Sequence, residues 1–187
     1  MIWLIALFTI LSYSTATHAI FYDKYRPSIY TRIIWFGIAF NNFASVFALH
    51  NSPGIKLMAT LAVAGNVAIL SLSLKKSKRT FGKTELISSI LLAASLIIWL
   101  TTHAPFLNLT IGLIANFIGG IPTIKKVIDD PRDEHFFFWF WFLLASSLAW
   151  ISADSSQLSG YLLPAYVVFF DGLMVLLCLR RYLPKKA

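Results

Sequence analysis

Seven long apolar runs determine what this chain can fold into. They cover about residues 2–22, 31–50, 55–74, 86–104, 107–126, 136–153 and 159–180, and short polar segments separate them. Roughly 20 apolar residues cross the hydrocarbon core of a bilayer as an α-helix, and these runs are too long and too continuously apolar for barrel strands. We therefore predict an all-α polytopic membrane protein with seven transmembrane helices.

The basic residues predict the orientation of these helices. With seven spans, alternate connections lie on the same side, and 15 of the 16 Lys and Arg residues fall on the side of the C-terminus, leaving only Lys56 on the other. Because cytoplasmic connections carry the excess of basic residues, we predict an outside N-terminus and a cytoplasmic C-terminus. The N-terminal run lacks a positive n-region, so we interpret it as a retained helix. We expect a multi-pass protein of the cell membrane, either plasma or bacterial inner.

The composition argues against several other classes of protein. Only 13% of the residues are charged, against about a quarter in soluble domains. The net charge of +8 does not indicate nucleic-acid binding, because the basic residues are confined to short connections. Cys178 is the single cysteine, so neither an internal disulfide nor a Cys/His metal site is expected. No HExxH, GxSxG, Walker or dinucleotide-binding motif is present, and we expect neither an enzyme nor a cofactor.

The chain carries a weak internal repeat. An offset of 104 residues pairs Pro27 with Pro131 and Trp35 with Trp139, and the offset becomes 105 after the second helix of each copy. The polar and proline positions match in order across three helices and their loops. Such repeats of a few helices are common in transporters.

The span at 86–104 has no counterpart in this repeat. A unit of three helices begins and ends on opposite sides of a membrane, so one additional helix is needed to make the two copies parallel. We therefore predict a single membrane domain, with a first triple-helix repeat at 1–82, a linker helix at 83–104 and a second triple-helix repeat at 107–183.

The resulting layout of three, one and three helices resembles the SWEET and PQ-loop superfamily of membrane transporters. The segment IPTIKK at 121–126 is similar to the Pro-Gln motif after the first helix of each repeat, although Thr123 stands at the glutamine position and His18 replaces the first proline. This superfamily includes sugar facilitators, lysosomal amino-acid transporters and retrieval receptors. The resemblance implies a transporter of a small polar solute, sugar-like or amino-acid-like.

Two polar residues at mid-depth are the first candidates for a solute site. Asp171 lies within VVFFDGLMV, where an ionised carboxylate costs about 2.5–3.5 kcal/mol on insertion scales, and Asn66 is its repeat partner. The resemblance implies that both face the substrate. Asn66 bonding a neighbouring helix, and Asp171 as a satisfied interior acid, are the alternatives.

The second helices of the two copies carry further candidates. Trp35 and Asn42 are seven residues apart and share a helix face, and Trp139 and Ser146 occupy the equivalent positions. An indole edge beside a hydrogen-bonding group suits a sugar ring or a similar solute. Anchoring at the membrane boundary is the other explanation for the tryptophans.

The first helices add Ser12 and Asn116 as candidate solute-binding residues. Gly119, Gly120 and Pro122 form a candidate hinge, because they loosen the helix and allow it to bend. We expect alternating access around a mid-membrane site between the repeats, with proton coupling through Asp171 as one option. The alternative is a non-transporting receptor or scaffold of the PQ-loop type. The expected partners are the lipid bilayer, the solute and protons, with no nucleic acid; a homo-oligomer is left open.

Overall fold

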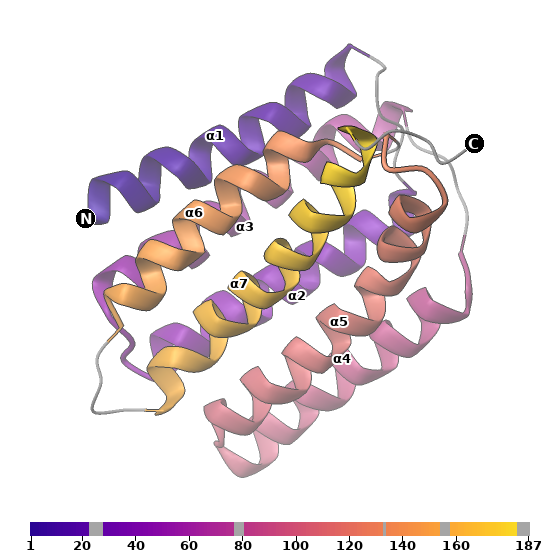
Figure 1. Cartoon of the computed structure of the whole chain (residues 1–187). Helices are drawn as coiled ribbons and strands as arrows, with labels where there is room; N and C mark the ends of the chain where they lie inside the picture. The colour runs from indigo at the N-terminus through magenta and orange to yellow at the C-terminus, as the bar shows by residue number, and fades with distance from the viewer. Residues whose placement is uncertain (23–27, 77–80, 133, 154–157, 183–187) are drawn as a thin grey trace.

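Seven α-helices and a short 3-10 turn make up the part of the chain that the computed structural model describes, which is residues 1–22, 28–76, 81–132, 134–153 and 158–182. They are α1 (Ile2–Phe21), α2 (Ile29–Ala48), α3 (Pro53–Lys76), α4 (Lys83–Thr102), α5 (Pro105–Asp129), α6 (Phe136–Ile151), α7 (Leu158–Leu179) and η1 (Arg180–Tyr182) (Figure 1). No strand occurs within these ranges, so the all-α prediction is confirmed.

The helix boundaries follow from local chemistry. α3 and α5 begin with Pro53 and Pro105, at a position where the missing N–H costs nothing. His103 ends α4 in the left-handed conformation, at φ 53°. Glu85 stabilises the start of α4, because its Oε2 accepts a hydrogen bond from the Gly82 N–H at 3.1 Å, and its Oε1 accepts one from Thr31 Oγ1 of α2 at 2.9 Å.

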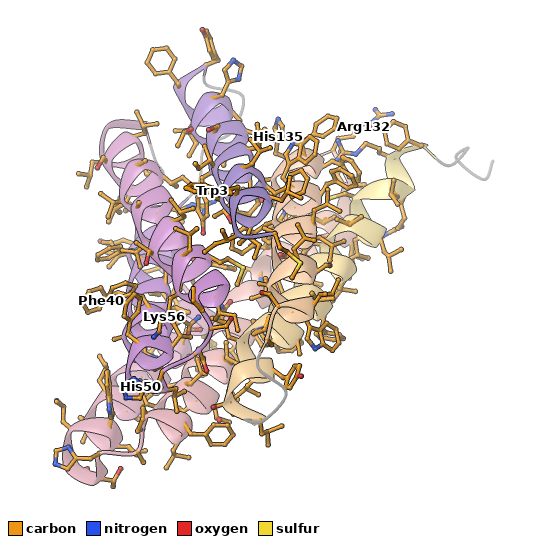
Figure 2. All side chains as sticks on the ribbon, turned by 90° about the vertical axis from the view of Figure 1, so that its left-hand side faces the viewer. Trp3, Phe40, His50, Lys56, Arg132 and His135 are labelled. Atoms are coloured by element: carbon orange, nitrogen blue, oxygen red, sulfur yellow. The ribbon has the colours of Figure 1, made fainter. Side chains whose placement is uncertain are left out.

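Five of these helices, namely α1, α3, α4, α5 and α7, are long and apolar enough to cross a membrane within the described residues. α6 has only 16 residues, and Arg32, Asn41 and Asn42 lower the hydropathy of α2. The outer surface is rich in large apolar side chains such as Trp3 and Phe40 (Figure 2), which are 81% and 52% exposed. Such a surface indicates a multi-pass membrane protein.

The helices pack in two corresponding sets. α3 packs against both α1 and α2, and α7 packs against both α5 and α6. Between the sets, α1 contacts α6 and α2 contacts α5, while α4 lies on α5 and α2 (Figure 1). Exchanging α1, α2 and α3 for α5, α6 and α7 maps the α1–α3 pair onto α5–α7, the α2–α3 pair onto α6–α7 and the α1–α6 pair onto α2–α5, whereas the contacts of α4 and a smaller α3–α6 contact have no counterpart of similar size.

The two ends of the bundle differ. We call the end where α5 finishes and α6 begins the basic end, since Arg132 and most other described basic residues lie there, whereas His50 and Lys56 lie toward the other end (Figure 2). Near that other end, six helices meet in one buried apolar cluster, the far cluster: Ile5, Val46, Ile55, Met58, Ala59, Leu109, Leu113, Ala149, Leu163 and Val167. The far cluster packs the six helices together in this half of the bundle, where Asn41, Ser45 and Asn108 are buried as well.

Candidate functional site

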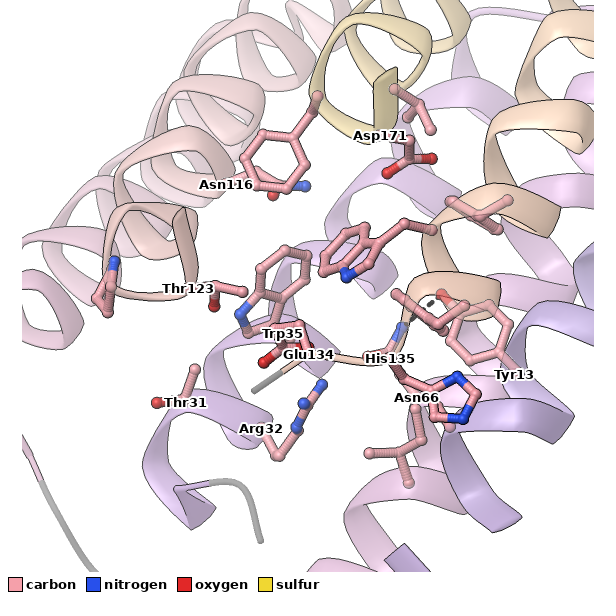
Figure 3. A pocket seen from close by; sticks show the side chains of 18 of the residues that line it. Tyr13, Thr31, Arg32, Trp35, Asn66, Asn116, Thr123, Glu134, His135 and Asp171 are labelled. Carbon is pink, nitrogen blue, oxygen red and sulfur yellow. Dashed lines mark hydrogen bonds between the residues drawn. The ribbon is translucent and has the colours of Figure 1, made fainter. Parts of the chain in front are cut away.

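A cavity of about 260 Å³ lies between the two sets of helices, on the side of the far cluster that faces the basic end. Six helices contribute to its lining, and only α4 does not. In Figure 3, Asp171 and Asn116 lie across the cavity from Arg32 and Thr31, with Trp35 between them. The volume is just below the range of drug-sized pockets, so the cavity suits a smaller solute.

The deep part of the cavity carries polar atoms without partners. Asp171 on α7 is 3% exposed, and its Oδ2 has no hydrogen-bond partner among the described residues. The same holds for Asn116 Oδ1 on α5, Trp139 Nε1 on α6 and Tyr166 Oη on α7. Buried polar groups are normally hydrogen-bonded, so a cluster of exceptions that lines one cavity points to a place where a ligand or water supplies the partners.

Asn66 and Tyr13 form the polar contact on the opposite wall. Asn66 Nδ2 donates to Tyr13 Oη at 3.0 Å and to the Ala62 carbonyl oxygen at 2.9 Å, so the amide of α3 is bonded to α1 (Figure 3). The Tyr13 ring in turn packs edge-on against Phe138 and Phe142, with centroids 5.6 Å away in both cases. Asn66 therefore lines the cavity and also joins two helices. The bond to a neighbouring helix was the alternative role predicted for Asn66 from the sequence.

Aromatic rings make up much of the remaining wall. The Phe170 ring is central, since its centroid lies 6.2 Å from that of Trp35, 5.8 Å from that of Trp139 and 6.0 Å from that of Tyr166. Trp139 is only 5% exposed, and therefore does not project into surrounding lipid as an anchoring tryptophan would.

Charged residues lie where the cavity reaches the basic end. Glu134 is 8% exposed and pairs with Lys126 at 3.4 Å, while the Lys126 side chain is 40% exposed. Arg181 Nη2 donates to the carbonyl oxygens of Pro131 and Glu134 at 2.9 and 3.0 Å, which ties the end of α7 to the connection between α5 and α6. We call this charged region, which also includes Arg32 and His135, the mouth of the cavity.

The structure brings five of the eight predicted solute-binding residues together in the cavity lining: Asn66, Asp171, Asn116, Trp35 and Trp139. It places the other three in helix contacts. Ser12 Oγ donates to the Phe138 carbonyl oxygen at 2.7 Å and joins α1 to α6. Ser146 Oγ donates to the Leu143 carbonyl oxygen of its own helix at 3.0 Å. Asn42 is 8% exposed and lies beside Gly112 of α5.

Of the three predicted hinge residues, only Pro122 lines the cavity. α5 is continuous through Pro122. Gly120 permits a close helix contact, because a Cβ at this position would lie 2.5 Å from Phe170 Cζ. Gly119 lies close to Ser88 of α4, whose Oγ would be 3.1 Å from an added Cβ. The glycines therefore have packing roles in this conformation.

Several lining residues were not predicted, including Tyr13, Phe138, Phe142, Tyr166 and Phe170. Aromatic residues are frequent throughout the apolar runs, so no pattern distinguished these. Arg32 was counted with the basic residues of a connection, because it is only the second residue of the predicted 31–50 span, and its place in the cavity lining was therefore not predicted.

Within the described ranges, no three His, Cys, Asp or Glu side chains are placed to hold a metal ion. No protein-family model matches the chain, and neither the curated proteins nor the solved structures contain a match.

Proposed function

We propose that the chain is a carrier that moves a small polar solute across a membrane by alternating access. The observation that carries this proposal is the cavity itself. It is lined by polar residues from both sets of helices, it reaches charged residues at the basic end, and the far cluster packs six helices together beyond it. A binding site with access from one side and a packed barrier on the other is the arrangement that a carrier requires.

The packing of the helices supports this proposal. The corresponding contacts of α1, α2 and α3 with α5, α6 and α7 are those expected of two parallel triple-helix repeats, with α4 as the linker. In this proposal all seven helices span the membrane. The polar residues of α2 are compatible with that, since Asn41 is 0% exposed and Asn42 is 8% exposed. The basic end then faces the cytoplasm, and membership of the SWEET and PQ-loop superfamily remains part of the proposal.

The experiment that tests this function is solute exchange in vesicles. The purified protein is first screened for thermal stabilisation by sugars, amino acids and vitamins, and each hit is then tested for counterflow into proteoliposomes. We expect at least one solute to exchange in protein-containing vesicles and not in empty ones. A folded protein that moves none of its stabilising solutes would instead favour the receptor or scaffold alternative.

Proton coupling can be tested at Asp171. It is the one acidic residue in the deep part of the described cavity lining, whereas Glu134 lies at the mouth. If Asp171 carries the coupled proton, uptake by Asp171→Asn should no longer vary with external pH. Asp129→Asn, which makes the same change at an exposed position, serves as the matched control and should keep the wild-type pH profile. An unchanged profile in Asp171→Asn would rule out the relay.

A further inference from the structure

The deep part of the cavity has the chemistry of a cation site. Asp171 is 3% exposed and forms no ion pair with any described residue. The basic residues of the lining, Arg32 and Lys126, lie at the mouth, and Figure 3 shows Arg32 on the far side of the cavity from Asp171. A buried carboxylate without a counter-ion is costly, so the ionised group gains most from a ligand that carries the positive charge.

The aromatic wall beside Asp171 favours the same kind of ligand. Phe170 precedes Asp171 on α7. The centroid of the Phe170 ring lies 6.2 Å from that of Trp35, 5.8 Å from that of Trp139 and 6.0 Å from that of Tyr166. The faces of aromatic rings attract cations, most strongly where water is excluded, and cages of such rings recognise ammonium groups. Rings and carboxylate together form a compact site for a positive charge on an apolar body.

Most of the unpartnered polar atoms in the deep part of the cavity can accept a hydrogen bond, so we expect the ligand to donate to them. Asp171 Oδ2 and Asn116 Oδ1 are acceptors, Tyr166 Oη can accept, and Trp139 Nε1 is a donor. No basic side chain of the described lining lies at this depth to bind a substrate carboxylate. The volume of about 260 Å³ limits the ligand to a small molecule.

We propose that the solute is a small organic ammonium ion, with its charge beside Asp171 and its carbon groups against Trp35, Trp139 and Phe170. This inference rests on the proposed function, because it names the class of solute that the carrier binds. It assigns Asp171 to direct contact with the solute.

The test uses pairs of probes that differ mainly in charge. Choline is compared with its neutral carbon isostere 3,3-dimethylbutan-1-ol, and 2-phenylethylammonium with 2-phenylethanol, by calorimetric titration of the purified protein. We expect at least one ammonium probe to bind about tenfold more tightly than its neutral partner. Asp171→Asn should abolish this preference, whereas Asp129→Asn should retain it.

The outcomes separate this inference from the proposed function. Equal affinity for charged and neutral partners, or a preference that persists in Asp171→Asn, would overturn the ammonium assignment. Binding and counterflow of a sugar or another neutral solute, with no binding of either ammonium probe, would also overturn it while leaving the carrier function intact. A folded protein that neither binds nor exchanges any solute would contradict both.

Discussion

At the scale of single residues, the wall of the cavity depends on a glycine. Gly65 on α3 faces the Tyr13 ring, and a Cβ on Gly65 would lie 2.1 Å from Tyr13 Cγ. The ring cannot easily move away, because Phe138 and Phe142 pack edge-on against it and Tyr13 is 9% exposed. The position of Tyr13 Oη, and with it the bond from Asn66, therefore requires glycine at 65.

We predict that Gly65→Ala destabilises the protein by about 1–3 kcal/mol, the usual cost of overpacking a filled core. Solute affinity should fall as well, because a displaced Tyr13 loses its bond with Asn66. Gly172→Ala is the matched control, since its added Cβ would meet only Leu143 Cδ1 at 4.0 Å, an ordinary contact. Thermal melting in detergent measures both variants, and equal melting temperatures would contradict the packing argument.

Individual residues also show why part of the site could not be predicted from the sequence. Asp171 and Asn66 were recognisable because polar groups are costly in apolar runs, and the structure places both in one cavity. Phe170 and Phe40 both lie in apolar segments, yet Phe170 is 2% exposed at the centre of the cavity wall and Phe40 is 52% exposed. Because lipid and protein interior are both apolar, hydropathy does not distinguish these two environments.

At the scale of elements, the helix boundaries were largely predictable. Each apolar run corresponds to one helix, and Pro53 and Pro105 stand at helix starts as their chemistry requires. The contacts between helices were harder to predict from the sequence. Ser12 looked like a solute ligand at its polar position, but its hydroxyl joins α1 to the Phe138 carbonyl oxygen of α6. Only the packing of α1 on α6 determines that partner.

The prediction at the scale of elements concerns bending of α5 at Pro122. Pro122 cannot donate the hydrogen bond that its position in the helix would otherwise make, so it weakens α5 beside the cavity. If this weakness lets α5 bend during transport, Pro122→Ala should slow counterflow several-fold, leave solute affinity nearly unchanged and raise the melting temperature. Calorimetry, counterflow rates and thermal melting measure these three quantities.

Pro164 provides the control for that prediction. It also lies inside a helix, α7, and is buried in a part of α7 closer to the far cluster. Pro164→Ala should leave the counterflow rate closer to wild type than Pro122→Ala does. A similar slowing in both variants would indicate a general effect of helix stiffening, and an unchanged rate in Pro122→Ala would contradict the hinge.

At the scale of the whole molecule, the proposed carrier function makes the cavity the open side and the far cluster the closed side of this conformation. Thr123 lines the cavity, whereas Ala149 is 0% exposed within the far cluster. Alternating access requires a second conformation in which the far cluster opens and the cavity mouth closes. Cysteines at these two positions can report the change, because the native Cys178 is itself 0% exposed and should react slowly.

We predict that a membrane-impermeant maleimide labels Thr123→Cys only from the side of the basic end, and that a transported solute slows this labelling. Ala149→Cys should react only from the opposite side, and only while the solute is being exchanged, because the far cluster must separate to expose it. Ile151→Cys, at a position 73% exposed at the end of α6, should react from that opposite side with or without solute and so reports vesicle orientation. Labelling of Thr123→Cys from the opposite side would contradict the closed far cluster. Continued protection of Ala149→Cys in vesicles that exchange solute would contradict its opening.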